Sequence, residues 1–297
     1  MTLLRGDLVS LLAVYKKEWR VRQKHVSFHA MSGMKKPEPI VYPYVTIEEM
    51  RAAPRLIENL PQKGSGTRYE GSTHARLALR LLQQLPTKNI AILECGPVWG
   101  QFTKLLQDRG YTNLHALDWV DMLHFPDKSK VSFHEINFNM ETIPYPDQHF
   151  DFATAWGIAE HMENPFHFVR EVYRVMKPGG TFLFSLPNVS HISSRIDFLF
   201  KGVFPRWNVK SNHIAILPSG IIEKTLYRYF EPVKVVYTKS GVMVTRKPKS
   251  SIRKYMEKLF DKVAVRIFKN SPLFGNYVCY VLKRRENVLP PVTHWPL

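Results

Sequence analysis

The sequence has little cysteine and no long apolar run. Its 297 residues include two cysteines, Cys95 and Cys279, which excludes a disulfide scaffold and a four-cysteine zinc cluster and is typical of a reducing compartment. The longest apolar run near the start, residues 8–15, is interrupted by Ser10 and is far shorter than the roughly 18 residues of a membrane span. Charged residues follow it where a signal peptide has small ones. We therefore expect a cytoplasmic protein, either free or at a membrane surface.

Acidic side chains are scarce in the last third of the chain. The formal net charge is +17, yet residues 54–194 are nearly neutral, whereas residues 195–297 hold 20 basic and 6 acidic residues. This distribution predicts a basic appendage on a neutral core. Its densest part, residues 247–269, has apolar residues at helical spacing. Two interpretations stay open: a helix lying on an anionic membrane surface, or a helix that covers its own domain and exposes its basic face.

Apolar segments of strand length alternate with helical patterns from residue 72 onward. The predicted strands are 89–95, 114–119, 131–138, 150–156, 181–187, 233–238 and 276–284. We therefore predict an α/β fold with a doubly wound, Rossmann-like, seven-stranded and mostly parallel sheet, helices on both faces, and insertions before and after the sixth strand. The predicted divisions are an N-terminal extension (1–60), the sheet domain (61–285) with a crevice-covering insertion (188–230) and a basic amphipathic insertion (241–274), and a C-terminal tail (286–297).

Polar residues follow the first three predicted strands, where the binding crevice of such a sheet lies. Glu94 precedes the loop after the first strand, Asp118 ends the second, and Asn137 ends the third. A carboxylate after the second strand can accept both ribose hydroxyls of an adenosine. An amide oxygen after the third can accept the adenine amino group, while a backbone N–H there reaches a ring nitrogen. The loop lacks the Gly-x-Gly-x-x-Gly pattern of dinucleotide-binding proteins.

Three segments carry a recognisable pattern: "ILECGPVWG", "LHALDW" and "IPYPDQHFDFATAWGIAEHMENPFHFVREVYRVMKPGGTFLFSLPN". Together they resemble the class I S-adenosylmethionine (SAM)-dependent methyltransferases over residues 89–190. The stretch "SLPNVSHISSRIDFLFKGVFP" is similar, more loosely, to members of sugar and small-metabolite pathways. The resemblance implies that SAM is the cofactor. It also implies a set of cofactor-binding residues: Glu94, Gly96, Gly100, Asp118, Trp119, Asn137, Phe138 and Trp156.

Two positions depart from the family pattern. Val98 stands where the glycine loop usually has a third glycine. SAM has no pyrophosphate, so a loop that binds SAM needs to approach its ligand less closely than a loop that binds a dinucleotide.

Some relatives bind a metal through two glutamates and a histidine near Glu160 and His161. Gly157 occupies the place of the first glutamate, so we predict no metal.

Methyl transfer from a sulfonium is an in-line displacement, so alignment supplies most of the catalysis. A base is needed only where the acceptor keeps its proton at neutral pH, as a hydroxyl does. His161, just past the fourth strand, is the predicted catalytic base, and its alternative role is a hydrogen bond that fixes the loop before Asn164. His191 and His213 are further candidates for the same task.

Three functions are compatible with the sequence. The leading one is O-methylation of a small molecule or glycan. The second is methylation of RNA or another nucleic acid by way of the basic last third, although "AWGIAEH" after the fourth strand differs from the Asn/Asp-Pro-Pro-Tyr/Phe that base-methylating enzymes place there. The third is an inactive methyltransferase-fold partner protein, suggested by Val98. We predict the first.

Overall fold

The computed structural model describes residues 46–48, 72–207, 211–238 and 270–290. The predicted N-terminal extension, apart from residues 46–48, lies outside these ranges, and so does the amphipathic segment 247–269. None of the described helices is long and apolar enough to cross a membrane.

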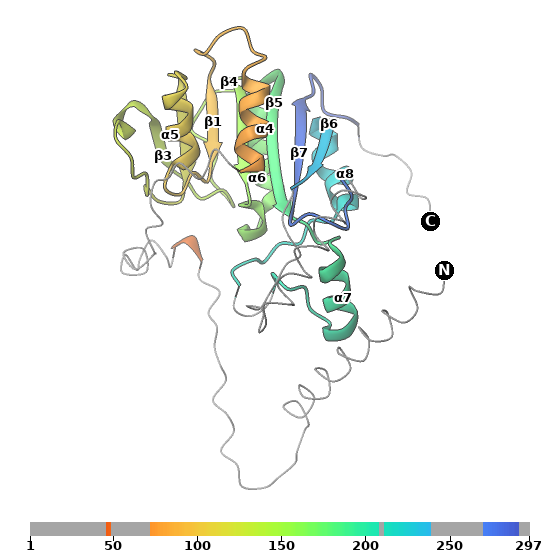
Figure 1. The fold of residues 1–297 in the computed structure, drawn as a ribbon. Coiled ribbons are helices and arrows are strands. Elements are labelled where there is room, and N and C mark those ends of the chain that lie inside the picture. The colour runs from red at the N-terminus through yellow and green to blue at the C-terminus, as the bar shows by residue number, and fades with distance from the viewer. Residues whose placement is uncertain (1–45, 49–71, 208–210, 239–269, 291–297) are drawn as a thin grey trace, which may run out of the picture.

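The described strands form one seven-stranded sheet in the order β3-β2-β1-β4-β5-β7-β6 (Figure 1). The pairs from β3 to β5 are parallel, and β7 runs antiparallel to both of its neighbours. This confirms the predicted fold class. The strands are β1 (Ile92–Cys95), β2 (Leu114–Asp118), β3 (Ser132–Glu135), β4 (Phe150–Trp156), β5 (Met176–Pro187), β6 (Phe230–Tyr237) and β7 (Tyr277–Arg284).

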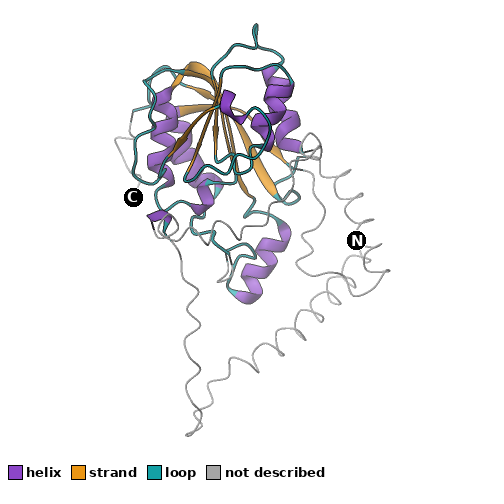
Figure 2. Ribbon diagram, turned by 90° about the vertical axis from the view of Figure 1, so that its left-hand side faces the viewer, coloured by secondary structure: helices purple, strands orange, loops and turns teal. Residues whose placement is uncertain are grey.

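Helices cover both faces of the sheet (Figure 2). They are α4 (Thr73–Leu82), α5 (Gln101–Asp108), α6 (Pro165–Val175), α7 (Ile192–Lys201) and α8 (Ser219–Tyr229), with short 3₁₀ turns η2 (Lys128–Lys130) and η3 (Ala159–His161). The side chains of Ser72 and Asn164 cap α4 and α6, because each accepts a backbone N–H group in the first turn of its helix.

The sheet has a separate apolar core on each face. Ile92 and Phe152 belong to the core that α4 and α5 cover. Leu93 and Phe182 belong to the opposite core, which α6 and α8 cover. Successive residues of a strand point to opposite faces, so β1 can supply both cores with an uninterrupted apolar run.

The insertion between β5 and β6 carries α7, which lies beyond the end of the sheet toward which β1 runs (Figure 1). Phe198 of α7 stacks on Phe204 with ring centroids 4.7 Å apart, and Phe204 meets Trp207 edge-on at 6.1 Å. These aromatic side chains of the insertion therefore pack against one another.

The third strand is shorter than predicted. The backbone N–H of Ile136 still donates to the Asp118 carbonyl, but the chain then turns, because the carbonyl of Asn137 accepts from the backbone of Met140 and Glu141. The asparagine side chain also accepts a backbone N–H within this turn, which is how asparagine favours a turn over continued pairing.

Candidate functional site

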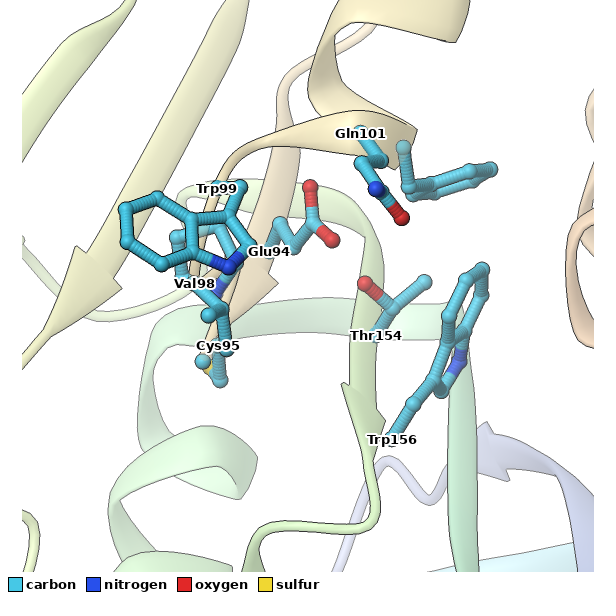
Figure 3. A pocket seen from close by; sticks show the side chains of 10 residues that line it. Glu94, Cys95, Val98, Trp99, Gln101, Thr154 and Trp156 are labelled. Carbon is cyan, nitrogen blue, oxygen red and sulfur yellow. The ribbon is translucent and has the colours of Figure 1, made fainter. Parts of the chain in front are cut away.

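The sheet changes direction between β1 and β4. The chain leaves β1 to build β2 and β3 on one side, and later builds β4 and β5 on the other. Ligands of open α/β sheets bind at the carboxyl ends of strands at such a point, and a cavity of about 330 Å³ lies there (Figure 3). Its wall comes from β1, the following loop, the start of α5, and β4: Glu94, Cys95, Gly96, Pro97, Val98, Trp99, Gln101, Phe102, Thr154 and Trp156.

Two glycines shape the loop after β1. Gly96 and Gly100 both have a φ of 72°, a conformation that residues with a Cβ seldom adopt. There is also no room for a side chain: a Cβ on Gly96 would lie 2.4 Å from Ile158 Cγ2, and one on Gly100 would lie 2.3 Å from Phe125 Cε1. The loop is therefore packed closely against Ile158 and Phe125, and of these two glycines Gly96 lines the cavity.

Val98 adopts the left-handed conformation of its glycine neighbours, with a φ of 52°. For an L-residue this conformation costs about 1–2 kcal/mol. The Val98 side chain is 43% exposed, and its backbone N–H donates to Asp118 Oδ2 at 3.1 Å. The loop thus keeps its glycine-like shape with a strained valine.

Asp118 links this loop to the end of β2. Its Oδ2 accepts the Val98 N–H, and its Oδ1 accepts the N–H of Trp119 at 2.8 Å. Neither Asp118 nor Trp119 is among the residues that line the cavity. Each carboxylate oxygen has a second acceptor site, so Asp118 can hold the loop and still accept hydroxyl groups of a ligand.

Two buried acids lie at the ends of β1 and β2. Burial raises the pKa of Glu94 to about 7, opposed by hydrogen bonds to Thr103 and reinforced by the charge of Asp118. Burial likewise raises the pKa of Asp118 to about 6, opposed by its two backbone hydrogen bonds. Glu94 accepts the Thr103 hydroxyl and lines the cavity (Figure 3). A cationic ligand would stabilise the ionised form of this acidic wall.

Thr154 and Trp156 stand two residues apart on β4, so their side chains share a face of the strand. Thr154 Oγ1 is buried, and no described residue hydrogen bonds to it. The Trp156 ring packs against Phe102 with centroids 4.4 Å apart and against His74 at 5.6 Å. A buried hydroxyl without a partner is costly, so Thr154 offers a ligand a polar contact beside an aromatic wall.

The structure gives Asn137 and Phe138 roles other than the predicted cofactor contacts. Asn137 is 1% exposed; its side-chain carbonyl accepts a backbone N–H of the following turn, and its amide donates to Glu48. Phe138 is buried and meets Phe168 edge-on at 5.0 Å. Neither residue lines the cavity. Both residues lie beyond the end of β3 at Glu135 and are buried.

A second group of polar side chains lies just past β4. The ring of His161 lies 4.7 Å from that of His213, and its Nδ1 donates to the Asn212 carbonyl at 3.2 Å. Glu160 is 1% exposed. Burial lowers the pKa of His161, lowers that of His213 to about 4, and raises that of Glu160 to about 7. Both imidazoles are therefore neutral near pH 7.

Sequence reasoning missed several of these residues. Thr154 could have been found, because it precedes Trp156 by two positions on a well-predicted strand. Gln101 and Phe102 begin α5, and no motif in the sequence marks their side chains as part of the cavity wall. His213 carries no local signal, since it lies far along the chain in an irregular part of the insertion.

A seven-stranded sheet with one antiparallel strand near its edge, and a glycine-shaped cavity where the strand order changes, defines a class of α/β proteins that bind nucleoside-like ligands. Residues 68–230 match the family model of the methyltransferase domain. These residues make up more than half of the chain. The chain therefore belongs to this family, the class I SAM-dependent methyltransferases.

Comparisons with individual proteins agree with this family assignment. A SAM-dependent methyltransferase of Mycolicibacterium smegmatis is 40% identical over 50 residues, 17% of this chain and 20% of that protein. The ubiquinone/menaquinone biosynthesis C-methyltransferase UbiE of Psychromonas ingrahamii is 36% identical over 75 residues, 24% of this chain and 30% of that protein. The chain thus spans less than a third of either relative. A SAM-dependent methyltransferase structure from Archaeoglobus fulgidus shares the fold, with a TM-score of 0.51, 17% identity, and coverage of 78% of this chain and all of that one.

SAM is the methyl donor of this family, and the cavity suits it. The buried carboxyl of Glu94 matches a ligand that carries ammonium and sulfonium charges. The Thr154 hydroxyl can donate a hydrogen bond to the ligand, and the rings of Trp156 and Phe102 can contact its apolar parts. Gly96 lines the cavity with its backbone, because it carries no side chain.

We expect Gly100→Ala to destabilise the protein more than Gly202→Ala. Both glycines have positive φ, 72° and 67°, but a Cβ at position 202 meets nothing within 4 Å. Gly202→Ala should cost about 1 kcal/mol for the backbone, and Gly100→Ala a further 1–3 kcal/mol for overpacking against Phe125. Urea unfolding measures both. Equal losses would show that the loop has room for a side chain.

We expect Val98→Gly to stabilise the protein by about 0.5–1 kcal/mol, because relief of left-handed strain exceeds the added freedom of the unfolded chain. Gln148→Gly is the matched control: Gln148 is exposed and has a φ of 56°, but its side chain is unbranched and its gain should be smaller. Thermal unfolding compares the two variants. A Val98→Gly protein less stable than the wild type would contradict the strain.

Binding of SAM should weaken as the pH falls from 8 to 5. The raised pKa values mean that Asp118 and Glu94 become protonated below about pH 6 and 7, and each then accepts hydrogen bonds and cations less well. Protonation of Asp118 alone should weaken binding roughly tenfold at pH 5. Calorimetry with SAM measures this, and Asp118→Asn should bind weakly with a flatter pH profile. An affinity equal at both pH values would remove Asp118 from the site.

The same shifts have the opposite sign for the unliganded fold. A raised pKa means that the folded state binds the proton more tightly than the unfolded state does, so these two groups add stability as the pH falls from about 7 to 4. A loss of SAM affinity over this range therefore cannot be ascribed to these carboxyls unfolding the domain.

Proposed function

We propose that the protein transfers the methyl group of SAM to a hydroxyl group of a small molecule or glycan. One observation carries this proposal. His161 lies just past the carboxyl end of β4, and its Nδ1 contacts a backbone carbonyl. A carbonyl only accepts hydrogen bonds, so the proton is on Nδ1 and Nε2 keeps its lone pair. A neutral imidazole of this kind can take the proton of a hydroxyl acceptor.

At the donor end we assign roles by position. The Gly96–Gly100 loop brings its backbone against the methyl donor. Glu94 receives the positively charged methionyl part, and Asp118 accepts the ribose hydroxyls. Trp119 is a positioning residue, because its backbone N–H fixes Asp118 Oδ1. Trp156 forms the aromatic wall.

At the acceptor end, the insertion between β5 and β6 meets β7 beside the cavity wall. Trp207 donates to the Ala215 carbonyl at 2.9 Å, and the Arg206 guanidinium lies over the Tyr277 ring at 4.4 Å from its centroid. Tyr277 in turn meets His74 edge-on at 5.8 Å. An aromatic enclosure of this kind suits a small acceptor and supports assigning 188–230 to acceptor binding within a domain spanning 61–285.

SAM, when bound, supplies an electrophilic methyl group on a sulfonium. The protein's part is to align the acceptor oxygen with that methyl, which the β1 loop and the β4 end do from opposite sides. His161 Nε2 accepts the hydroxyl proton as the new O–C bond forms, and the proton stays on the imidazole until solvent removes it. An amine or carboxylate acceptor would not need this step.

The competing acceptor is RNA, because the last third of the chain is strongly basic. Its densest segment, 247–269, lies outside the described residues, as does the proposed contact with an anionic membrane. The test therefore includes RNA among the acceptors. We also propose that the protein acts in the cytoplasm. Methyl transfer to RNA that disappears with added salt would replace the small-acceptor assignment.

The test is radiolabelled methyl transfer from SAM to panels of phenols, sugars, amines, carboxylic acids and total RNA. We expect label on a hydroxyl compound. With that acceptor, His161→Ala should slow turnover by a hundredfold or more, while SAM affinity changes by less than about twofold. His134→Ala is the control, because His134 is exposed on β3. Label confined to amines, with full activity of His161→Ala, would contradict the proposal.

A further inference from the structure

The most distinctive unexplained feature is the cluster past β4. Glu160, His161 and His213 each offer one ligand atom, and the three atoms lie within 4.8 Å of one another. Two of these residues are adjacent in η3, and the third comes from the insertion between β5 and β6. Of the described residues, this is the group of histidine and acidic side chains that comes close enough to hold a metal ion.

We propose that Glu160, His161 and His213 bind one divalent transition-metal ion, of the class of Zn²⁺, Co²⁺ or Mn²⁺. Two imidazole nitrogens and one carboxylate oxygen are the ligands that such ions take. Ligand atoms bound to one ion at about 2.0–2.2 Å lie no more than about 4 Å apart. The cluster therefore needs a contraction of at most about 0.8 Å, which side-chain rotation can supply.

The carboxylate in the cluster lacks the partner that its burial demands. Glu160 is 1% exposed, and no described residue hydrogen bonds to its buried Oε2. No described arginine or lysine lies within ion-pair distance of it, and the charge of Arg206 acts on it only from farther away. An ionised carboxylate kept from water in this way needs a cation or a second hydrogen bond. A metal ion would supply the first.

The two histidines are in the state that a metal requires. His161 donates from Nδ1 to the Asn212 carbonyl, which leaves the Nε2 lone pair for a cation. A histidine that ligates a metal characteristically donates its other N–H to a backbone carbonyl or a carboxylate in this way. His213 has a buried Nδ1 to which no described residue hydrogen bonds, so it too has an atom to give.

Backbone hydrogen bonds hold the two halves of the cluster together. The carbonyl of Glu160 accepts the N–H groups of Ile214 and Ala215 at 2.8 and 3.0 Å. These contacts, with the bond between His161 and Asn212, place His213 beside η3 before any ion binds. The ligands are thus largely preorganised, which lowers the entropic cost of binding.

Gly157 explains how the cluster fits together. A Cβ at that position would lie 3.2 Å from Glu160 Oε1, so glycine leaves the carboxylate its space. The sequence argument against a metal relied on the absence of a glutamate at position 157. It could not take His213 into account, because only the fold brings that residue to the cluster.

The site's consequence for catalysis rests on the proposed function. Three protein ligands leave at least one coordination position for water or for an acceptor oxygen. His161 Nε2 cannot both bind an ion and accept a proton. With an ion bound, the cation instead of the imidazole would meet the acceptor hydroxyl and favour its ionised form.

The test is metal binding by the tag-free full-length protein after dialysis against a chelator. Calorimetry with Zn²⁺ and the visible spectrum with Co²⁺ should both show one ion per chain. Glu160→Gln and His213→Ala should each weaken binding at least tenfold, with His134→Ala as the matched control. Ca²⁺, which prefers oxygen ligands, should not bind at this site. Wild-type protein that binds no Zn²⁺ or Co²⁺, or variants that bind as tightly as the wild type, would overturn the site.

The same samples separate this inference from the proposed function. Glu160→Gln preserves shape, so a normal circular dichroism spectrum and thermal midpoint will show that lost metal binding is not lost folding. If His213→Ala fails to fold, Glu160→Gln alone decides. SAM binding by calorimetry should be unchanged in both folded variants. Loss of metal with SAM binding and methyl transfer intact would leave the enzyme assignment standing and remove the ion from its mechanism.

Discussion

The hydrogen bond from the Val98 backbone to Asp118 Oδ2 is the contact on which the rest of the site depends. It ties the loop after β1, which lines the cavity, to the end of β2. The same carboxylate also fixes the start of the next connection through Trp119. One buried acid thereby sets the spacing of two loops. The loop can be strained at Val98 because the surrounding structure determines its conformation.

The strands were predictable because each is a short apolar run, and β4 has the bounds that its sequence pattern predicted. The cavity lies where the sequence predicted a crevice, at the carboxyl ends of strands, and Glu94 lines it. The predicted end of the third strand was wrong, because β3 ends at Glu135, before Asn137 and Phe138. The cause is local: the asparagine side chain competes for backbone hydrogen bonds and starts a turn, which an apolar pattern that continues through Phe138 does not reveal.

No pattern in the sequence could predict which side chains lie beside His161 in the fold. Its neighbour Glu160 was visible, but their partner arrives from an insertion with little regular structure. Residues of that kind are brought together by tertiary contacts alone, here the backbone bonds between the insertion and η3. The cavity residues of β1 and the loop after it are therefore neighbours in the sequence, while the group around His161 depends on how the insertion packs.

Those backbone bonds have a mechanical consequence. The segment carrying His213 is hydrogen bonded to the backbone of Glu160, whose side chain lies close to that histidine. Outward movement of the segment would therefore separate the His213 imidazole from the Glu160 carboxylate. None of these bonds involves a residue that lines the cavity on β1 and β4. The position of the insertion is therefore coupled to the group around His161 through contacts separate from the cavity wall.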